Sequence, residues 1–511
     1  MRRPFATFLL ALGVSAMAVA ADAADLYVSV GGSGKGTAAA PFGRIQHALN
    51  VAAPGDVVIV SDGTYKEALR TVRGGTTSEP ILIRARGERG SVVVTTPGRV
   101  LTVRHPNIIV QNLVLDGRYG LSDLIRIESA AHGFTLRGSE VRRTSRDAID
   151  MGAPEDVLIE DTLIHRALNP VKGRSDAHGI VAGAVRRLTI RNTEIHTFSG
   201  DAFQIDPGRS PEGWSDVLIE GCRFWLEPMA EFENGFPAGT VPGENAIDTK
   251  SSAEAPRATL TLRDTVAHGF RDGLIANMAA FNLKENIDAV FDGVTVFDSD
   301  IAFRMRGPGA NGGARIRIQN AVIHSSGAAF RFEDDVEAPR IYNVTVGGGV
   351  NRPFVGLTSS QTVLDVRNTL FLGKRLPAQA KGGSNQAVAS TAFVEAAAHD
   401  YQLSDESPAV DAGEPLPTVL HDRRGTPRPQ GDAYDVGAFE RRDPTALPAN
   451  KVCGSRDFRN GSTLVKGEFP RDFSELHDRS GWRQDCSCAG QSTGLVSRPG
   501  CHTTAEGWGD L

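Results

Sequence analysis

The residue types best suited to chemistry in this chain gather between positions 176 and 306. A neutral lysine can take a proton from carbon, and carboxylates can hold a divalent cation that stabilises the charge left behind. Lys250 follows Asp248 by two residues, so both side chains leave the same face of a strand. The candidates are the base Lys250, the carboxylates Asp176, Asp201, Asp206 and Asp248, and the binding groups Arg271, Asn277, Arg304 and Arg306.

These side chains are far apart in sequence, so a repeating architecture must bring them together. Ten short segments carry apolar residues at period two and are each interrupted by one Asn, Gly or Asp. These residue types adopt the left-handed conformation most easily, and a bend between two strands requires that conformation. The ten positions, spaced 23 to 43 residues apart, are Asn112, Gly138, Asp161, Asn192, Gly221, Asp264, Gly293, Asn320, Asn343 and Asn368.

A repeat of this length without a helical pattern predicts an all-β chain, a right-handed parallel β-helix of about ten or more coils with three short strands per coil. Residues 42–53 have helical spacing, which predicts an amphipathic helix that covers the open end of the first coil. The segments 407–413 and 435–440 are interpreted as closing coils.

The sequence divides into three expected parts. Residues 1–24 have two arginines, an apolar run and then small residues, the order of a secretory signal peptide, so we expect a secreted or periplasmic protein. Residues 25–440 form the β-helix, and no segment there is apolar enough to span a membrane. Residues 441–511 form an irregular tail with four of the five cysteines, which predicts two disulfides, with a zinc site as the alternative.

The composition narrows the classes of partner. Hydrophobic residues make up 40% of the chain, which excludes a disordered protein. The 55 Lys and Arg against 61 Asp and Glu give a formal charge of −6, so no nucleic-acid partner is expected. An acidic substrate stays compatible, because a local basic groove or a bound cation can receive it. We expect a monomer.

The second strand of each coil can be aligned on its inward apolar residue. The aligned residues are Ile149, Ile180, Phe203, Ile247, Leu274 and Phe303. Stacked strands lie about 4.8 Å apart, so this alignment places Lys250 beside Asp206 and Asn277 on adjacent coils. The longest interval contains an insertion from Trp225 to Gly243, which predicts an aromatic wall beside this strand.

The opening from Tyr27 to Tyr65, the repeated coils and the closing stretch 435–440 resemble the pectate-lyase-like right-handed β-helix superfamily. The stretch 243–250, with Asp176 and Asp201 upstream, is most similar to polysaccharide lyase family nine. This resemblance implies cleavage of an acidic polysaccharide, with Lys250 as base and Ca²⁺ held by aspartates. Gln204 stands where that family favours a further acid.

We therefore expect calcium-dependent β-elimination on a uronate polymer, pectate-like or alginate-like. A glycoside hydrolase, which needs two carboxylates at a set separation, and a uronate epimerase are alternatives on the same fold. A non-catalytic carbohydrate-binding or surface β-helix is a third, in which the outward charges form a solvated ion-pair ladder. His178 is interpreted as a turn residue, and His165, His196, His268 and His324 as a surface ladder.

Overall fold

The computed structural model describes residues 23–171, 176–205, 212–251, 255–273, 275–284, 286–307, 313–333, 336–357, 364–373 and 375–441. The predicted signal peptide, the cysteine-bearing tail and Asp206 lie outside these residues, apart from positions 23, 24 and 441. Within the described ranges, no helix has the length and apolar character needed to cross a membrane.

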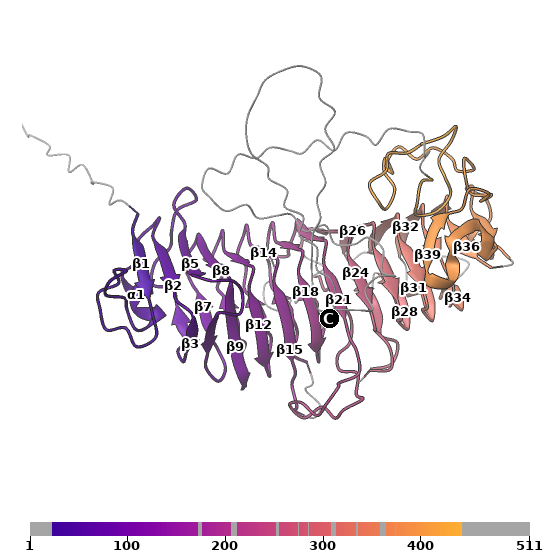
Figure 1. Cartoon of the computed structure of the whole chain (residues 1–511). Coiled ribbons are helices and arrows are strands. Elements are labelled where there is room, and N and C mark those ends of the chain that lie inside the picture. The colour runs from indigo at the N-terminus through magenta and orange to yellow at the C-terminus, as the bar shows by residue number, and fades with distance from the viewer. Residues whose placement is uncertain are drawn as a thin grey trace, which may run out of the picture. The chain divides into compact units, whose positions relative to one another are not determined.

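Three parallel sheets form the body, and each coil adds one strand to sheet A, then sheet C, then sheet B (Figure 1). Sheet A contains β1 (Asp25–Val28), β2 (Val57–Val60), β5 (Ile81–Ala85), β8 (Ile108–Gln111), β11 (Thr135–Arg137), β14 (Leu158–Glu160), β17 (Thr189–Arg191), β20 (Val217–Glu220), β23 (Ala258–Arg263), β26 (Ile287–Asp292), β29 (Arg315–Gln319), β32 (Glu337–Tyr342) and β35 (Asp365–Arg367).

Sheet C contains β3 (Gly63–Tyr65), β6 (Val92–Thr95), β9 (Leu113–Gly120), β12 (Glu140–Thr144), β15 (Leu163–Ala167), β18 (Glu194–Phe198), β21 (Arg223–Trp225), β24 (Val266–His268), β27 (Thr295–Phe297), β30 (Val322–His324), β33 (Thr345–Val346), β36 (Leu370–Leu372) and β37 (Gln386–Val388). Sheet B contains β4 (Leu69–Arg70), β7 (Leu101–Val103), β10 (Ile125–Ile127), β13 (Ile149–Met151), β16 (Ile180–Ala182), β19 (Phe203–Ile205), β22 (Ile247–Asp248), β25 (Ala279–Leu283), β28 (Ile301–Arg306), β31 (Ala328–Glu333) and β34 (Arg352–Val355). The predicted all-β parallel β-helix is confirmed.

From β8 to β36, the bends between sheets A and C are the ten predicted positions. All ten residues have φ between 46° and 70°, in the left-handed region. Stacked polar side chains contact one another there, since Asn192 donates to Asp161 Oδ1 at 3.2 Å and Asn368 to Asn343 Oδ1 at 3.4 Å. Inside the coils, apolar side chains stack in register. Phe281, Phe303, Phe330 and Phe354 follow one another with ring centroids 5.2 to 5.9 Å apart.

The helix α1 (Ile45–Val51) lies within the range predicted for a helix. Ile45, Ala48 and Leu49 are buried in the core, and α1 packs against β1, β2 and β4, the first strands of sheets A and B. The buried carboxylate of Glu67 accepts the backbone N–H groups of Ile45 at 2.8 Å and Gln46 at 3.2 Å, which satisfies donors at the start of the helix. The role of α1 in covering the open end of the first coil stays a prediction.

The interpretation of 407–413 and 435–440 as closing coils is wrong. After β37 the chain forms an antiparallel pair, β38 (Phe393–Glu395) with β39 (Asp400–Leu403), next to the short 3₁₀ turns η2 (Ala378–Ala380), η3 (Ser390–Ala392) and η4 (Ala396–Ala398). Residues 405–441, which we call the return segment, then contact the bends between sheets A and C. Asn343 Nδ2 donates to the Asp435 carbonyl at 3.0 Å, and Asn368 Nδ2 donates to the Glu414 carbonyl at 2.8 Å. The side-chain amides of Asn343 and Asn368 therefore donate N–H groups to backbone carbonyls of the return segment.

Candidate functional site

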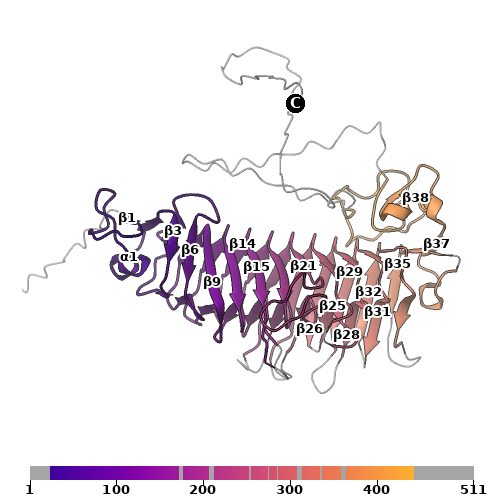
Figure 2. The ribbon, with the colours of Figure 1, turned by 60° about the horizontal axis from the view of Figure 1, so that its bottom comes forward.

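The outward face of sheet B carries four of the nine predicted site residues, namely Asp248, Lys250, Arg304 and Arg306. Strands β22, β25, β28 and β31 are successive neighbours in this sheet, and Figure 2 labels the last three. Their pairing places four outward residues in one column, namely Asp248, Asn282, Arg304 and Arg331. A second column two residues further along contains Lys250, Lys284, Arg306 and Glu333. We call these eight residues the sheet B strip.

The predicted alignment is wrong at one coil. Ile247 pairs with Phe281, not Leu274, and Phe281 pairs with Phe303. Lys284 therefore takes the place beside Lys250 that the alignment gave to Asn277. Asn277 lies in the turn before β25 with φ 59°, exposed, and accepts a hydrogen bond from Arg331 Nη1 at 2.8 Å. The physical reason is the turn from β24 to β25, which is seven residues longer than the turn from β27 to β28 and whose Asp272-Gly273 imitates the start of the earlier strands.

Asp248 and Lys284 form an ion pair at the β22 end of the strip. Lys284 Nζ lies 2.8 Å from Oδ1 and 2.9 Å from Oδ2 of Asp248, and Asn282 Nδ2 donates to Oδ1 at 2.9 Å. Lys250 Nζ is farther away, at 3.8 Å from Oδ2. The Lys250 side chain is 36% exposed and that of Lys284 is 18% exposed. Lys284 thus neutralises Asp248, while Lys250 stays open to a substrate.

The carboxyl groups of Asp248 and Glu244 both have raised pKa values. Burial raises the pKa of Asp248 to about 6; the Asp201 carboxylate adds to the rise and Lys284 opposes it. Burial also raises the pKa of Glu244 to about 7, with Asp201 and then Asp176 as further causes. At neutral pH Glu244 is therefore populated in both protonation states, which suits a group that gives or takes a proton.

Asp201 belongs to a buried polar ladder at the turn that precedes sheet B. Asp147, His178, Asp201 and Asn245 each stand two residues before the inward residue of β13, β16, β19 or β22, and all four are at most 7% exposed. Asp147 Oδ1 accepts the backbone N–H of His178 at 3.1 Å, and His178 Nδ1 accepts that of Asp201 at 2.7 Å. Asp201 Oδ1 accepts that of Asn245 at 3.1 Å, and Asn245 Oδ1 accepts that of Ala279 at 3.1 Å. Each side chain thereby fixes the next coil.

The carboxylates predicted to hold calcium are already occupied by N–H donors or lie elsewhere. Gln204 Nε2 donates to Asp201 Oδ2 at 2.9 Å, so both oxygens of Asp201 are bonded, as are both of Asp248. Asp176 is exposed, and Asp206 lies outside the described residues. No three acids, histidines or cysteines in the described part of the chain are grouped to hold a metal ion. Calcium requires six to eight oxygens, so the described residues do not fit a calcium cage.

The predicted substrate-binding arginines are placed on two different elements. Arg304 and Arg306 lie on β28 within the strip, and both contact Glu333. Arg271 lies in the turn before β25, where its guanidinium binds Asp272 at 3.0 Å and Asp298 at 2.8 Å. Arg304 and Arg306 are therefore brought together with Lys250 on one face, and Arg271 is engaged by exposed acids next to it.

The insertion from Trp225 to Gly243 folds back along the turns between sheets C and B. Glu233 accepts hydrogen bonds from Tyr119 at 2.5 Å and Arg166 at 3.0 Å, and Asn234 donates to Ser145 at 2.9 Å. Phe236 is buried against Leu168 and Met229, so it cannot stack on a sugar as predicted. Phe232 is 70% exposed and is the aromatic side chain of this insertion that remains free for such contact.

Trp225 is also unavailable, because its ring lies in a stack on sheet C. Its centroid is 4.3 Å from that of His196 and 6.0 Å from that of His268, with nearly parallel planes. The full stack consists of His165, His196, Trp225, His268, Phe297, His324 and His399. Burial lowers the pKa values of His196, His268 and His324 to about 3. The predicted histidine ladder exists, but it is a largely buried ring stack instead of a surface ladder, and His196, His268 and His324 are neutral at pH 7.

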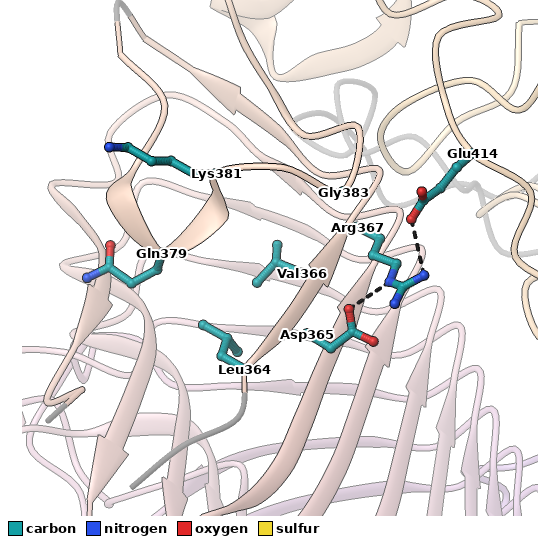
Figure 3. Close-up of a pocket in the computed structure, with 8 residues that line it drawn as sticks. All are labelled: Leu364, Asp365, Val366, Arg367, Gln379, Lys381, Gly383 and Glu414. Atoms are coloured by element: carbon teal, nitrogen blue, oxygen red, sulfur yellow. Dashed lines mark hydrogen bonds and ion pairs between the residues drawn. The ribbon is translucent and has the colours of Figure 1, made fainter. Parts of the chain in front are cut away.

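A separate pocket of about 370 Å³ opens near the C-terminal coils (Figure 3). Its lining residues are Leu364, Asp365, Val366, Arg367, Gln379, Lys381, Gly383 and Glu414. Arg367 lies between two acids, 2.7 Å from Asp365 and 3.3 Å from Glu414, and is satisfied by them. None of the predicted site residues lines this pocket.

Sequence reasoning missed five residues of the site: Glu244, Asn282, Lys284, Arg331 and Glu333. A signal for Arg331 was present, because Ala329-Phe330-Arg331 repeats the pattern Ala302-Phe303-Arg304 one coil later. Lys284 was hidden by the wrong alignment at Leu274. Glu244 carries no sequence signal, because its raised pKa comes from burial and from carboxylates that the fold brings together.

No protein-family model matches the chain. An uncharacterized protein of Bacillus subtilis (strain 168), YwoF, is 26% identical over 204 residues, and the match covers 35% of this chain and 40% of that protein. The chain thus spans two fifths of the length of this curated relative.

Similar solved structures include pectate lyase Pel9A, with a TM-score of 0.48 and 16% identity over 82% of this chain and 96% of that one. A rhamnogalacturonan lyase has a TM-score of 0.48 and 14% identity over 75% and 95%, and an alginate lyase from Paenibacillus sp. str. FPU-7 has 0.41 and 15% over 67% and 99%. The sequence resemblance named pectate lyases, and a pectate lyase is among these similar structures. The parallel β-helix is given by the chain's own strand pairings.

Proposed function

We propose that this protein is an exported polysaccharide lyase that cleaves a uronate polymer by β-elimination, with Lys250 as the base. The observation that carries the proposal is the position of Lys250, open on the strip and beside the Asp248–Lys284 ion pair. The strip holds five cationic side chains against two carboxylates, on a chain whose formal charge is −6. A local excess of positive charge suits a polymer that carries carboxylates.

The reaction starts when the unprotonated Lys250 amine takes the proton from C5 of a bound uronate. The electron pair of the C5–H bond forms the C4–C5 double bond, the C4–O bond breaks, and the leaving oxygen takes a proton from solvent. Negative charge grows on the uronate carboxylate during the first step. Lys284 and Arg304, on the two following coils, provide fixed cations that stabilise it. Lys284 is not the base in this proposal, because its amine is engaged by Asp248 at 2.8 Å.

The calcium requirement comes from the sequence resemblance alone and stays a prediction. The reaction above therefore contains no calcium step. An assay in parallel with and without a chelator tests this requirement separately from the role of Lys250.

Glycoside hydrolysis is the second candidate, and the raised pKa values of Glu244 and Asp248 favour it. A hydrolase needs one carboxylic acid and one carboxylate near the scissile bond. At neutral pH, Glu244 near its pKa and ionised Asp248 could fill these two roles. A hydrolase releases new reducing ends without an unsaturated product, so the products separate the two reactions.

The test is incubation with polygalacturonate and with alginate, following the ultraviolet absorbance of the new double bond. We expect absorbance on at least one of them, and its loss by about 10²-fold or more in Lys250→Ala. Lys381→Ala removes an exposed lysine outside the strip and is the matched control. Reducing ends without absorbance would favour the hydrolase, and binding without any product would favour a non-catalytic carbohydrate-binding protein.

A further inference from the structure

The C-terminal end of the sheet B strip contains three arginines around one carboxylate. Arg304 donates to Glu333 through two nitrogens, at 3.1 and 3.0 Å, and Arg331 Nε lies 2.7 Å from Glu333 Oε1. Arg306 Nε lies 3.1 Å from Glu333 Oε2. Although burial opposes it, the Arg304 hydrogen bond and the arginine charges hold the pKa of Glu333 below its ordinary value. Glu333 is therefore ionised at neutral pH.

One carboxylate cannot satisfy three guanidinium groups. Among the described residues, Glu333 is the acid that pairs with Arg304, Arg306 and Arg331. These four side chains together therefore carry two positive charges in excess. Arg306 Nε is buried and makes no hydrogen bond of good geometry within the described residues, despite its short distance to Glu333. The three side chains are still between 21% and 34% exposed, so a ligand can reach them.

The position of this cluster relates it to the proposed reaction. Arg304 lies two coils from Asp248 and Arg331 three coils away, which at about 4.8 Å per coil is about 10 and 14 Å. On the other side of Asp248 the same column carries the uncharged Gln204 and Val181. The excess of cations therefore lies on one side of the lysines only.

We propose that Arg304, Arg306 and Arg331 form a carboxylate-binding subsite for an anionic sugar of the substrate, several coils from Lys250 on the side of β31. The proposal rests on the proposed function for the identity of the polymer. The guanidinium fork matches a carboxylate in bidentate fashion, and the seated Glu333 shows that a carboxylate fits among these three side chains. Glu333 keeps the arginines ordered before the substrate arrives, so less side-chain entropy is lost on binding.

The test measures binding in the full chain carrying Lys250→Ala, so that the polymer is not cut. We expect Arg331→Ala and Arg304→Ala to weaken binding of polygalacturonate by roughly tenfold, as loss of a bidentate ion pair predicts. Arg315→Ala is the matched control, because Arg315 lies on sheet A and binds a single exposed acid, Glu337, at 2.7 Å. Binding of methyl-esterified polygalacturonate, which lacks the charges, should not respond to Arg331→Ala.

Two further arms keep the proposal open to refutation. Arg331→Lys keeps the positive charge and loses the bidentate guanidinium. It should bind polygalacturonate better than Arg331→Ala and worse than the parent. It also replaces Arg331→Ala in the test if that variant does not fold. If Arg331→Ala and Arg331→Lys both bind as Arg315→Ala does, the subsite is refuted. If dextran sulfate binds as tightly and with the same dependence on Arg331, the assignment to carboxylate is refuted.

These results separate the subsite from the lyase. Binding that depends on Arg331, with no uronan cleaved by the parent chain, would refute the lyase and keep the subsite. Cleavage of a uronan by the parent chain, with arginine variants that bind like the control, would keep the lyase and refute the subsite.

Discussion

Asp201 Oδ1 accepts two hydrogen bonds from Asn245, one from its backbone N–H at 3.1 Å and one from its amide at 2.8 Å. Gln204 donates a hydrogen bond to the other carboxylate oxygen of Asp201. Asp201 therefore connects two consecutive coils of the body in the turn that precedes sheet B. The resemblance gave this residue the role of a calcium ligand, whereas its bonds are those of a residue that holds the turn before β22.

Asp201→Ala should lower the free energy of unfolding by about 1–3 kcal/mol, because it leaves buried N–H donors of Asn245 without an acceptor. Thermal and urea unfolding measure this effect. Asp405→Ala, which removes an exposed acid that follows β39, should stay within about 0.5 kcal/mol of the parent. Equal stability of the two variants would contradict the role given to the ladder.

The acid limb of the pH–rate profile should lie near pH 6, where Asp248 becomes ionised and pairs with Lys284. Lys284→Ala removes a cation that lowers the pKa of Asp248, so this limb should move to higher pH. The measurement is kcat/KM against pH with whichever uronan is cut. Lys381→Ala should leave the limb in place, and an unmoved limb in Lys284→Ala would show that the pair does not control activity.

The histidine stack should make the fold sensitive to acid. His196, His268 and His324 have pKa values of about 3 in the folded protein and about 6.5 when unfolded. Between these values the unfolded chain binds more protons, so stability rises with pH from about 3 to about 6.5 and is level above that range.

Melting temperatures at pH 4.5 and pH 7.5 measure this dependence. His196→Phe keeps a ring between His165 and Trp225 but cannot be protonated, so its difference between the two pH values should be smaller than that of the parent. An unchanged difference would mean that other groups cause the acid sensitivity.

Gly138→Ala should destabilise the protein by more than a glycine substitution in open space. Gly138 has φ 58°, and an added Cβ would lie 2.3 Å from Asn112 Oδ1 on the preceding coil. Gly239 has φ 80° with nothing within 4 Å of an added Cβ, so Gly239→Ala has only the backbone cost of about 1–2 kcal/mol. Thermal unfolding compares the two, and equal losses would show that contact between stacked bends contributes nothing.

The bends were predictable because their chemistry is local. Asn, Gly and Asp adopt the left-handed conformation most easily, and one of them stands at each of the ten predicted bends, so these positions predicted the coils and sheets A and C. Sheet B lacks a signal of this kind. Its strands were aligned on their inward apolar residues, each chosen two positions after a polar residue such as Asp147, Asp201 or Asn245.

That polar ladder ends at Ala279, whose backbone N–H is the last donor and whose side chain is apolar. The sequence therefore offered Asp272 as a false match, and the true neighbours Asn282 and Lys284 went unrecognised. The pKa values of Glu244 and Asp248 and the three-arginine cluster could not be predicted either, since each depends on burial and on charges from different coils.

The return segment gives the last coils a partner that is synthesised after them. Asn320 donates to the His421 carbonyl at 2.9 Å, and the buried Arg428–Glu440 ion pair lies against the same bend. A solenoid can fold progressively, because each repeat contacts only its neighbours. As the polypeptide emerges from the ribosome or a translocation channel, the early coils can form at once, whereas those at Asn320, Asn343 and Asn368 must wait until residue 440 has followed.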